Sequence, residues 1–324
     1  MNTGKTGSER ILQLYSILKE ESDEAHPISM TRLIGELETD GCQADRRTIY
    51  HDMELLNQYG FCVHYARHGQ KIQGYWLEHA FTPAETVLLA GAVEESLSLT
   101  EEAGSAVIAK LLNSLSGSDR SALKLNVPAT GKTDNPNVLN YVDLILQAIR
   151  TARPIEFRYY DMTISRQKKY RRSAHLYHEV PYAVVTDNGR IYCILYASKY
   201  GSFGAFRVDK MDAVSIVNEP AELKPFDLNR FMQASFHMYT GTPETITCEF
   251  DLSLLNPVFD QFGRSIIISS VKEHSFTASI QASVTPTLIS WLLQFYDRIT
   301  VLKPASLIQK LSDMGDVLQN RYGS

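Results

Sequence analysis

The stretch that most constrains the fold is Asp45–Gly60, because both ends of a single helix are marked within it. Asp45 can cap the amino end by accepting a hydrogen bond from a backbone N–H. Gly60 can adopt the left-handed conformation that ends a helix, with the apolar Phe61 folding back over the last turn. The stretch therefore predicts one helix that begins after Asp45 and ends before Gly60.

The two faces of this helix differ in chemistry. Apolar residues at i, i+4 and i+7 predict one buried face, formed by Ile49, Met53 and Leu56. The other side carries hydrogen-bond donors and an aromatic ring in the first two turns, where a recognition helix meets base edges and phosphates. The residues that we expect to contact DNA from this helix are Arg46, Arg47, Thr48, Tyr50 and His51. On this stretch alone, an ordinary amphipathic surface helix is the alternative interpretation.

The segments on either side favour DNA binding. Ser8 and Ser29 can cap two earlier helices, and the second of these is closed by Gly41, only a few residues before Asp45. Two helices joined by so tight a turn have helix-turn-helix spacing. After Gly60 the apolar period changes from 3.6 to 2, which predicts a β-hairpin and hence a winged helix. The tip residues that we expect to reach phosphates are Arg67, His68 and Lys71.

The charge balance limits how tightly one copy can bind DNA. The whole chain has a formal net charge of −5, and residues 1–79 hold eight Lys and Arg against twelve Asp and Glu. Attraction to phosphates must therefore come from a local patch. Two copies would double the number of phosphate contacts, which is one reason to expect a homodimer.

A helical region is expected to follow the first domain. Thr82–Glu85 forms a capping box with proline at the first helical position, and helices are predicted over about 82–97, 101–115 and 137–150. Residues 116–136 are rich in Ser, Gly, Pro, Thr and Asn and are predicted to be a loop or linker. We expect these helices to connect domains, with dimer contact as a second possible role.

From Pro154 the sequence predicts short strands rich in aromatic and β-branched residues, which suggests a small β-barrel. Asp187–Gly189 is a strong hairpin signal between two of the strands. Residues 150–172 contain eight Lys and Arg but only two Asp and Glu. That basic run is either a solvated strand edge or a site for an anion or nucleic acid. From about Thr242 a small α+β module follows, in which we identify no chemistry.

Several classes of function are disfavoured. The four cysteines lie far apart without a C-x-x-C pair, so neither a zinc site nor a disulfide framework is expected. No signal peptide is recognised, and no apolar run approaches the ~20 residues of a membrane span. Gly131–Thr133 resembles the end of a P-loop but lacks the first glycine, and His175–Glu179 has the wrong order for a metalloprotease. We therefore expect a cytoplasmic protein that is not an enzyme and has no cofactor. If the protein is an enzyme after all, the remaining alternative is a hydrolase whose catalytic residues are dispersed along the sequence.

The segment Arg47–Asp52 resembles the R-T-I-x-R-D signature of bacterial winged-helix regulators of the WYL-domain family, with His51 in place of the usual arginine. Residues 154–159, 181–192 and 206–211 are similar to the first strand, central hairpin and F-R-L-D-R-I strand of the WYL domain. Ser290–Leu293 and Val301–Pro304 resemble the extension that often follows it. The similarity runs in the expected order over nearly the whole chain.

This resemblance implies a ligand groove and identifies candidates for it. Two positions depart from the family pattern: the namesake Trp-Tyr-Leu is Ile191-Tyr192-Cys193 here, and Gly204 replaces a common arginine. The ligand can therefore differ or bind more weakly. Tyr182 and Tyr192 could instead belong to the barrel core. The resemblance implies Tyr192 and Arg207 as candidates for ligand binding, with Tyr182 next. The basic run adds Lys169, Arg171 and Arg172.

We therefore predict an α+β multidomain protein. The predicted parts are a winged helix-turn-helix at 1–79, a helical linker at 80–150, a small SH3/Sm-like WYL-like β-barrel at 151–225, and an α+β extension at 240–324. The predicted function is transcriptional regulation through a double-stranded DNA operator, with the barrel sensing an anionic ligand such as a nucleotide or single-stranded nucleic acid. The alternative is a nucleic-acid sensor or adaptor whose barrel is the main binding surface and whose winged helix makes protein contacts.

Overall fold

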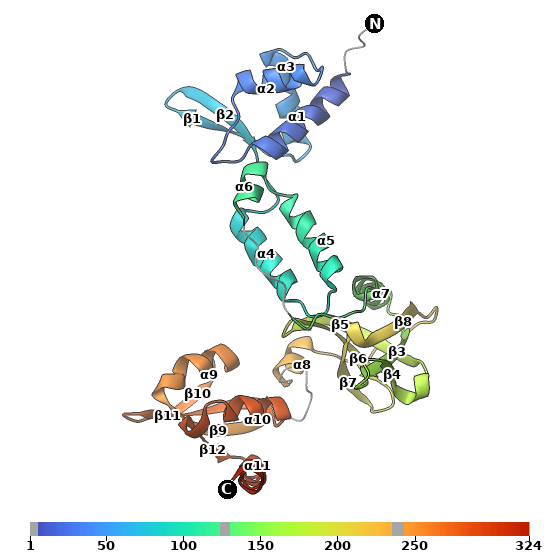
Figure 1. Ribbon diagram of the computed structural model, residues 1–324, viewed down its shortest axis with the longest axis vertical. Coiled ribbons are helices and arrows are strands. Elements are labelled where there is room, and N and C mark those ends of the chain that lie inside the picture. The colour runs from blue at the N-terminus through green and yellow to red at the C-terminus, as the bar shows by residue number, and fades with distance from the viewer. Residues whose placement is uncertain (1–5, 124–129, 235–242, 324) are drawn as a thin grey trace. The chain divides into compact units, whose positions relative to one another are not determined.

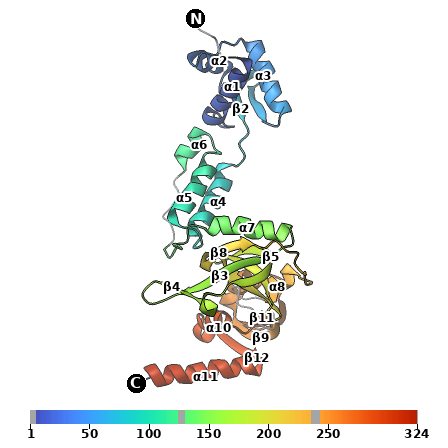
Figure 2. The same cartoon turned by 90° about the vertical axis from the view of Figure 1, so that its right-hand side faces the viewer.

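The structure is a computed structural model that describes residues 6–123, 130–234 and 243–323. The chain divides into two compact units, Met1–Pro136 and Asn137–Ser324, each described here by itself. Figures 1 and 2 show helices followed by a hairpin in the first unit, and two sheets with helices in the second.

The first unit begins with three helices packed around one core. Leu14, Leu33 and Ile49, one from each helix, are fully buried in it. The helices are α1 (Gly7–Glu21), α2 (Met30–Thr39) and α3 (Arg46–Gln58). Thr6 caps α1, so the prediction of Ser8 as the cap is wrong. Thr6 and Glu9 form a reciprocal capping box, whereas three residues after Ser8 stands Ile11, which has no carboxylate to return a bond.

Both predicted ends of α3 are confirmed. Asp45 Oδ1 accepts from the Thr48 N–H at 2.8 Å. Gly60 has a φ of +87°, and the next N–H, of Phe61, donates to the Leu56 carbonyl at 2.9 Å. The Phe61 ring folds back onto Tyr15 of α1, with ring centroids 4.8 Å apart.

A two-stranded antiparallel hairpin follows α3, as predicted. It consists of β1 (Val63–His68) and β2 (Lys71–Leu77). The backbones of Tyr75 and Ile28 exchange two hydrogen bonds of 2.8 Å, which attach the hairpin to the segment before α2. Gly74 makes this approach possible, because a Cβ atom there would lie 2.8 Å from the Ile28 carbonyl oxygen.

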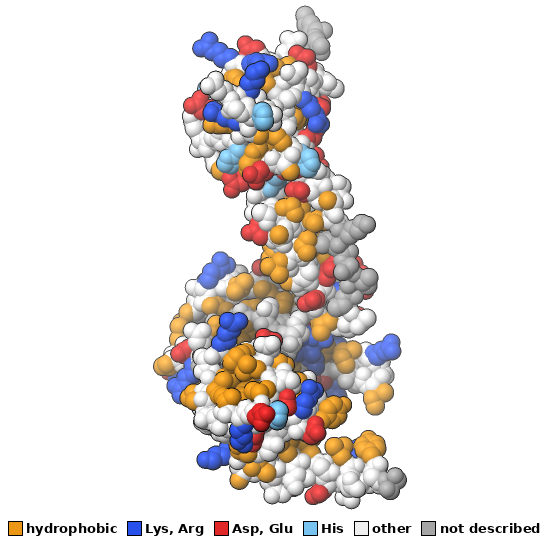
Figure 3. All heavy atoms as spheres, turned by 90° about the vertical axis from the view of Figure 1, so that its left-hand side faces the viewer, with side chains coloured by type: hydrophobic (Ala, Val, Ile, Leu, Met, Phe, Trp, Pro, Cys, Tyr) orange, Lys and Arg blue, Asp and Glu red, His pale blue; other side chains and the backbone are white. Residues whose placement is uncertain are grey.

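Three more helices complete the first unit: α4 (Pro83–Glu95), α5 (Glu101–Leu112) and α6 (Gly117–Ala122). The capping box of Thr82 and Glu85 is confirmed. Helix α6 lies in a stretch predicted as loop; Ser116 caps it by accepting from the Asp119 N–H. Residues 124–129 of that predicted loop lie outside the described residues. Hydrophobic side chains lie on the surface of the α4–α5 segment (Figure 3). Of the large hydrophobic residues of α4, Leu88 is the most exposed.

The second unit contains an antiparallel six-stranded sheet that curls around an apolar core (Figure 2). Its order is β4-β3-β5-β6-β7, with β8 also paired to β3. Asn188 and Gly189 have positive φ values, which confirms the predicted tight turn between β5 and β6. Helix α7 packs into this core through Tyr141 and Ile145. These elements are α7 (Val138–Arg150), β3 (Ile155–Met162), β4 (Lys168–Tyr170), β5 (Tyr177–Asp187), β6 (Arg190–Ala197), β7 (Ser202–Arg207) and β8 (Met211–Ile216).

The remaining elements include a four-stranded antiparallel sheet of order β10-β11-β9-β12. The α+β module that the sequence predicts from about Thr242 is present. The elements are α8 (Leu228–Ala234), β9 (Pro243–Asp251), α9 (Leu255–Phe262), β10 (Ile267–Val271), β11 (Ser275–Ser283), α10 (Pro286–Leu293), β12 (Ile299–Lys303) and α11 (Ala305–Tyr322). Among the described helices, none is long and apolar enough to cross a membrane.

Candidate nucleic-acid and ligand-binding sites

Helix α3 presents its cationic side chains to solvent. Arg46, Arg47 and His51 are exposed, and neither arginine forms an ion pair within the described part of the chain. Thr48 is half-buried and gives its backbone N–H to the cap. The exposed Tyr50 is anchored at its tip, because the Tyr75 hydroxyl donates to the Tyr50 hydroxyl at 2.8 Å. The outward face of α3 is therefore held in place while its guanidinium groups stay available.

The inner side of α3 is locked by an ion pair. Arg10 of α1 donates to both carboxylate oxygens of Asp52, at 2.7 and 3.1 Å. The Asp52 side chain is only 1% exposed. Hydrogen bonding to Asp52 raises the pKa of Arg10, although partial burial acts in the opposite direction. This contact determines the rotation of α3 and thus which residues face outward.

The hairpin residues predicted to reach phosphates are exposed. Arg67, His68 and Lys71 surround the turn, and the Arg67 guanidinium lies 4.6 Å from the centroid of the Tyr65 ring. The Asn57 side chain at the end of α3 accepts from the Val63 N–H at 2.7 Å, so helix and hairpin are joined directly.

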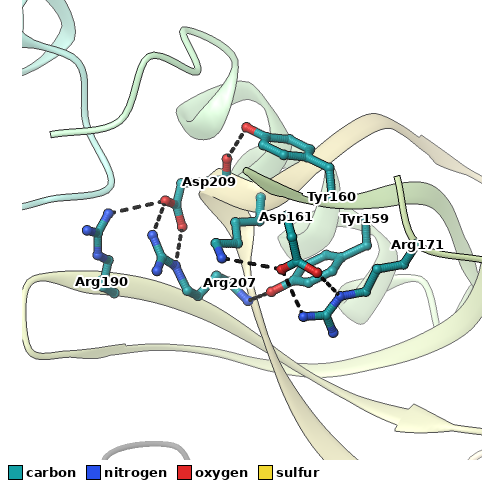
Figure 4. Close-up of polar contacts among 8 residues, drawn as sticks. Tyr159, Tyr160, Asp161, Arg171, Arg190, Arg207 and Asp209 are labelled. Atoms are coloured by element: carbon teal, nitrogen blue, oxygen red, sulfur yellow. Dashed lines mark hydrogen bonds and ion pairs between the residues drawn. The ribbon is translucent and has the colours of Figure 1, made fainter. Parts of the chain in front are cut away.

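In the second unit, the sheet brings Tyr192 and Arg207 together as cross-strand neighbours on β6 and β7. The Arg207 guanidinium donates to Asp209 through two bonds of 3.0 and 2.6 Å. Arg190 donates to the same carboxylate at 3.2 Å. Figure 4 shows Asp209 between the two arginines. Two half-buried guanidinium groups thus share one buried carboxylate.

The environments of these two arginines affect their pKa values differently. Burial opposes the charge of Arg207, but the hydrogen-bonded Asp209 outweighs it and raises the pKa. At Arg190 burial dominates, Arg207 adds repulsion, and the pKa is lowered. Burial also raises the pKa of the Tyr192 hydroxyl, which therefore stays protonated and able to donate. A bound anion would stabilise the charge of Arg190.

The basic run supplies two further arginines near this cluster, each already paired. Arg171 binds Asp161 through two bonds of 2.7 and 2.9 Å and lies over the Tyr159 ring, 5.0 Å from its centroid. The Tyr159 hydroxyl accepts from the Arg207 N–H at 3.2 Å, which links Arg171 to the Arg207 cluster (Figure 4).

Arg172 lies over the Tyr177 ring at 3.9 Å, with Glu179 3.9 Å away. Lys169 is exposed on β4 and forms no ion pair among the described residues.

Tyr182 lies in a different environment. Its hydroxyl accepts from the Lys224 N–H at 2.6 Å, and its ring packs on Phe203 and Phe226. The strand register places Tyr192 opposite Val185 rather than Tyr182. The structure therefore groups Tyr192 with Arg207 but does not bring Tyr182 to them.

Sequence reasoning missed Arg190, Asp209 and Tyr159. Arg190 directly follows the predicted turn and Asp209 follows the F-R-V strand. Their positions can be read from the sequence, but nothing in the sequence indicates that the two side chains meet.

Of the two positions that depart from the family pattern, Cys193 is fully buried in the sheet core and does not line an open surface. Gly204 lies on β7 opposite Leu195. Within the described residues, no cluster of three or more His, Cys, Asp or Glu side chains could hold a metal ion.

A known domain family covers this sheet. Residues 140–216 match the family model of the WYL domain. No curated protein matches the chain. Two solved structures are similar at low identity. Proteasome accessory factor B/C (PafBC) of Arthrobacter aurescens is 18% identical over 93% of this chain and 44% of that one, with a TM-score of 0.28. A CRISPR Cas-related protein is 10% identical over 98% and 92% of the two chains, with a TM-score of 0.35. This chain thus spans less than half the length of the first structure. Residues 140–216, which include α7 and the curled sheet with its arginine cluster, are a WYL domain.

Proposed function

We propose that this protein is a DNA-binding transcriptional regulator whose WYL domain senses an anionic ligand, such as a nucleotide or single-stranded nucleic acid. In this proposal the three helices and hairpin of the first unit act as a winged helix-turn-helix. The curled sheet acts as an SH3/Sm-like sensing barrel. The protein works in the cytoplasm by binding rather than by catalysis.

The observation that carries the proposal is the outward face of α3. Arg46 and Arg47 stand side by side in the first turn, both exposed, and neither forms an ion pair within the described part of the chain. The neighbouring Asp45 accepts from the Thr48 N–H as the helix cap. Arg10 and Asp52 hold the helix in one orientation. Arginine in the first turns of such a helix can bind guanine edges bidentately or contact phosphates.

The sensing role is supported by the arginines of the sheet. Arg207 and Arg190 converge on one carboxylate, and the pKa of Arg190 is lowered by its surroundings. An arriving phosphate or carboxylate can compete with Asp209 for these donors and form charge-assisted bonds. Such a ligand regulates DNA binding only if it favours one arrangement of the protein over another.

A homodimer is part of the proposal. Leu88 on α4 is 73% exposed, and Val87 and Leu89 beside it are also exposed. A second copy would cover this apolar surface. Two α3 helices could then contact successive major grooves of a two-fold operator.

The acidic balance of residues 1–79, twelve Asp and Glu against eight Lys and Arg, favours a second candidate. In it the WYL domain is the main nucleic-acid surface and the first unit binds another protein.

The test begins with parallel selections of bound sequences by the full-length protein, one from a random duplex pool and one from a random single-stranded pool. Fluorescence anisotropy on the selected duplex then compares wild type with Arg47→Ala, which we expect to weaken binding by about 1–3 kcal/mol. Arg32→Ala is the matched control, because Arg32 is an exposed arginine of the same unit that pairs with Glu21 on α1. Equal affinities of wild type and folded Arg47→Ala for the duplex would show that α3 does not bind DNA. Selection of single strands only would favour the second candidate.

A further inference from the structure

A cavity of about 360 Å³ lies in the first unit between α1, the end of β2 and α5. Its walls include Lys19 of α1, His79 just after β2, and Lys110 and Asn113 at the end of α5. Its volume falls in the range of small-molecule sites. It lies apart from the outward face of α3 and belongs to a different compact unit from the WYL domain.

The two lysines make this cavity cationic. Neither Lys19 nor Lys110 forms an ion pair with a described residue. Glu78 is the one acidic residue in the described lining, and its carboxylate is engaged by His64, 2.8 Å away. Tyr15 is the remaining titratable side chain of the wall. The cavity wall therefore carries two lysines that have no ion-pair partner among the described residues.

His79 also lines the cavity. Its Nδ1 lies 3.0 Å from the Ser114 carbonyl oxygen, and its Nε2 lies 2.9 Å from that of Ser22. These two contacts hold the ring between the end of α1 and the end of α5.

We propose that this cavity is a binding site for a small phosphate-like anion, held by the ammonium groups of Lys19 and Lys110 and the amide of Asn113. His79 shapes the cavity wall rather than binding the anion, since both of its ring nitrogens already contact backbone carbonyl oxygens. Because the lysines come from α1 and α5, the bound anion ties the three-helix part of the first unit to the α4–α5 segment. The existing link from the Ser116 hydroxyl to Asp23, at 2.8 Å, joins the same two parts. This site does not depend on DNA binding or on the WYL domain.

The test is isothermal titration of the full-length protein with inorganic phosphate and pyrophosphate at constant ionic strength. We expect saturable binding that Lys19→Gln and Lys110→Gln each weaken about tenfold, the usual consequence of losing one charged hydrogen bond. Lys310→Gln, which removes an exposed helical lysine from the other unit, should leave binding unchanged.

Absence of saturable binding would overturn the proposal. So would equal binding by wild type and a folded Lys19→Gln/Lys110→Gln double variant, or an equal loss in Lys310→Gln. Because no DNA is present, these outcomes are independent of whether α3 reads a duplex.

Discussion

Substituting Arg10 should cost more stability than substituting Asp52, because the two side chains of this ion pair differ in exposure. The Asp52 side chain is 1% exposed and that of Arg10 is 20% exposed. Arg10→Met leaves a carboxylate buried without its cation, which costs about 3–5 kcal/mol. Asp52→Asn leaves an arginine that water can reach and an amide that still accepts one bond, so the loss should be about 1–3 kcal/mol.

The double variant separates charge from packing. In Arg10→Met/Asp52→Asn no charge remains, and the methionine keeps much of the apolar contact of the arginine stem. We expect its stability to lie close to that of Asp52→Asn alone, which gives a favourable coupling between the two positions.

Equilibrium unfolding in urea measures these differences. The chain has two tryptophans; Trp76 lies on β2 and stacks on His64 with centroids 4.5 Å apart. A Trp291→Phe background leaves Trp76 as the reporter of the first unit, which avoids treating a multidomain chain as two-state. Equal losses in the two single variants, or a loss below about 1 kcal/mol in Arg10→Met, would refute the argument that burial decides the cost.

Two further substitutions test other contacts. Gly74→Ala places a Cβ atom 2.8 Å from the Ile28 carbonyl oxygen; we expect a loss of about 1–3 kcal/mol in the Trp76 transition, and an unchanged transition would mean that this backbone contact is not required. Leu88→Glu introduces a charge on the exposed apolar surface of α4. The stability of the folded monomer should change by less than about 0.5 kcal/mol. Sedimentation velocity should show that the dissociation constant of the proposed dimer rises at least tenfold. Unchanged self-association would exclude this surface as the dimer contact.

Local signals in the sequence predicted much of the fold. Three features depend on residues within a few positions of one another: the ends of α3, the capping box of Thr82 and the turn at Asn188. A short stretch of sequence is therefore enough to predict each of them. Elements without such marks were missed. Strand β8 is defined by its pairing to β3, which lies much earlier in the chain. Strand β10 pairs locally with β11, but its five residues are all exposed and show no apolar alternation.

What the sequence by itself determined is therefore where chemistry-bearing side chains stand along the elements: arginines in the first turn of α3, a basic run before β5, and Arg207 at the end of β7. What only the tertiary structure decided is which of these charges remain available. Arg171 and Arg207 both form ion pairs, with Asp161 from β3 and Asp209 from beyond β7, whereas Arg46 and Arg47 form none with the described residues. The reason is that these ion pairs depend on tertiary geometry. Arg171 reaches Asp161 beside the pairing of β3 and β4. Even Arg207 and Asp209, only two residues apart, meet because the chain turns directly after β7.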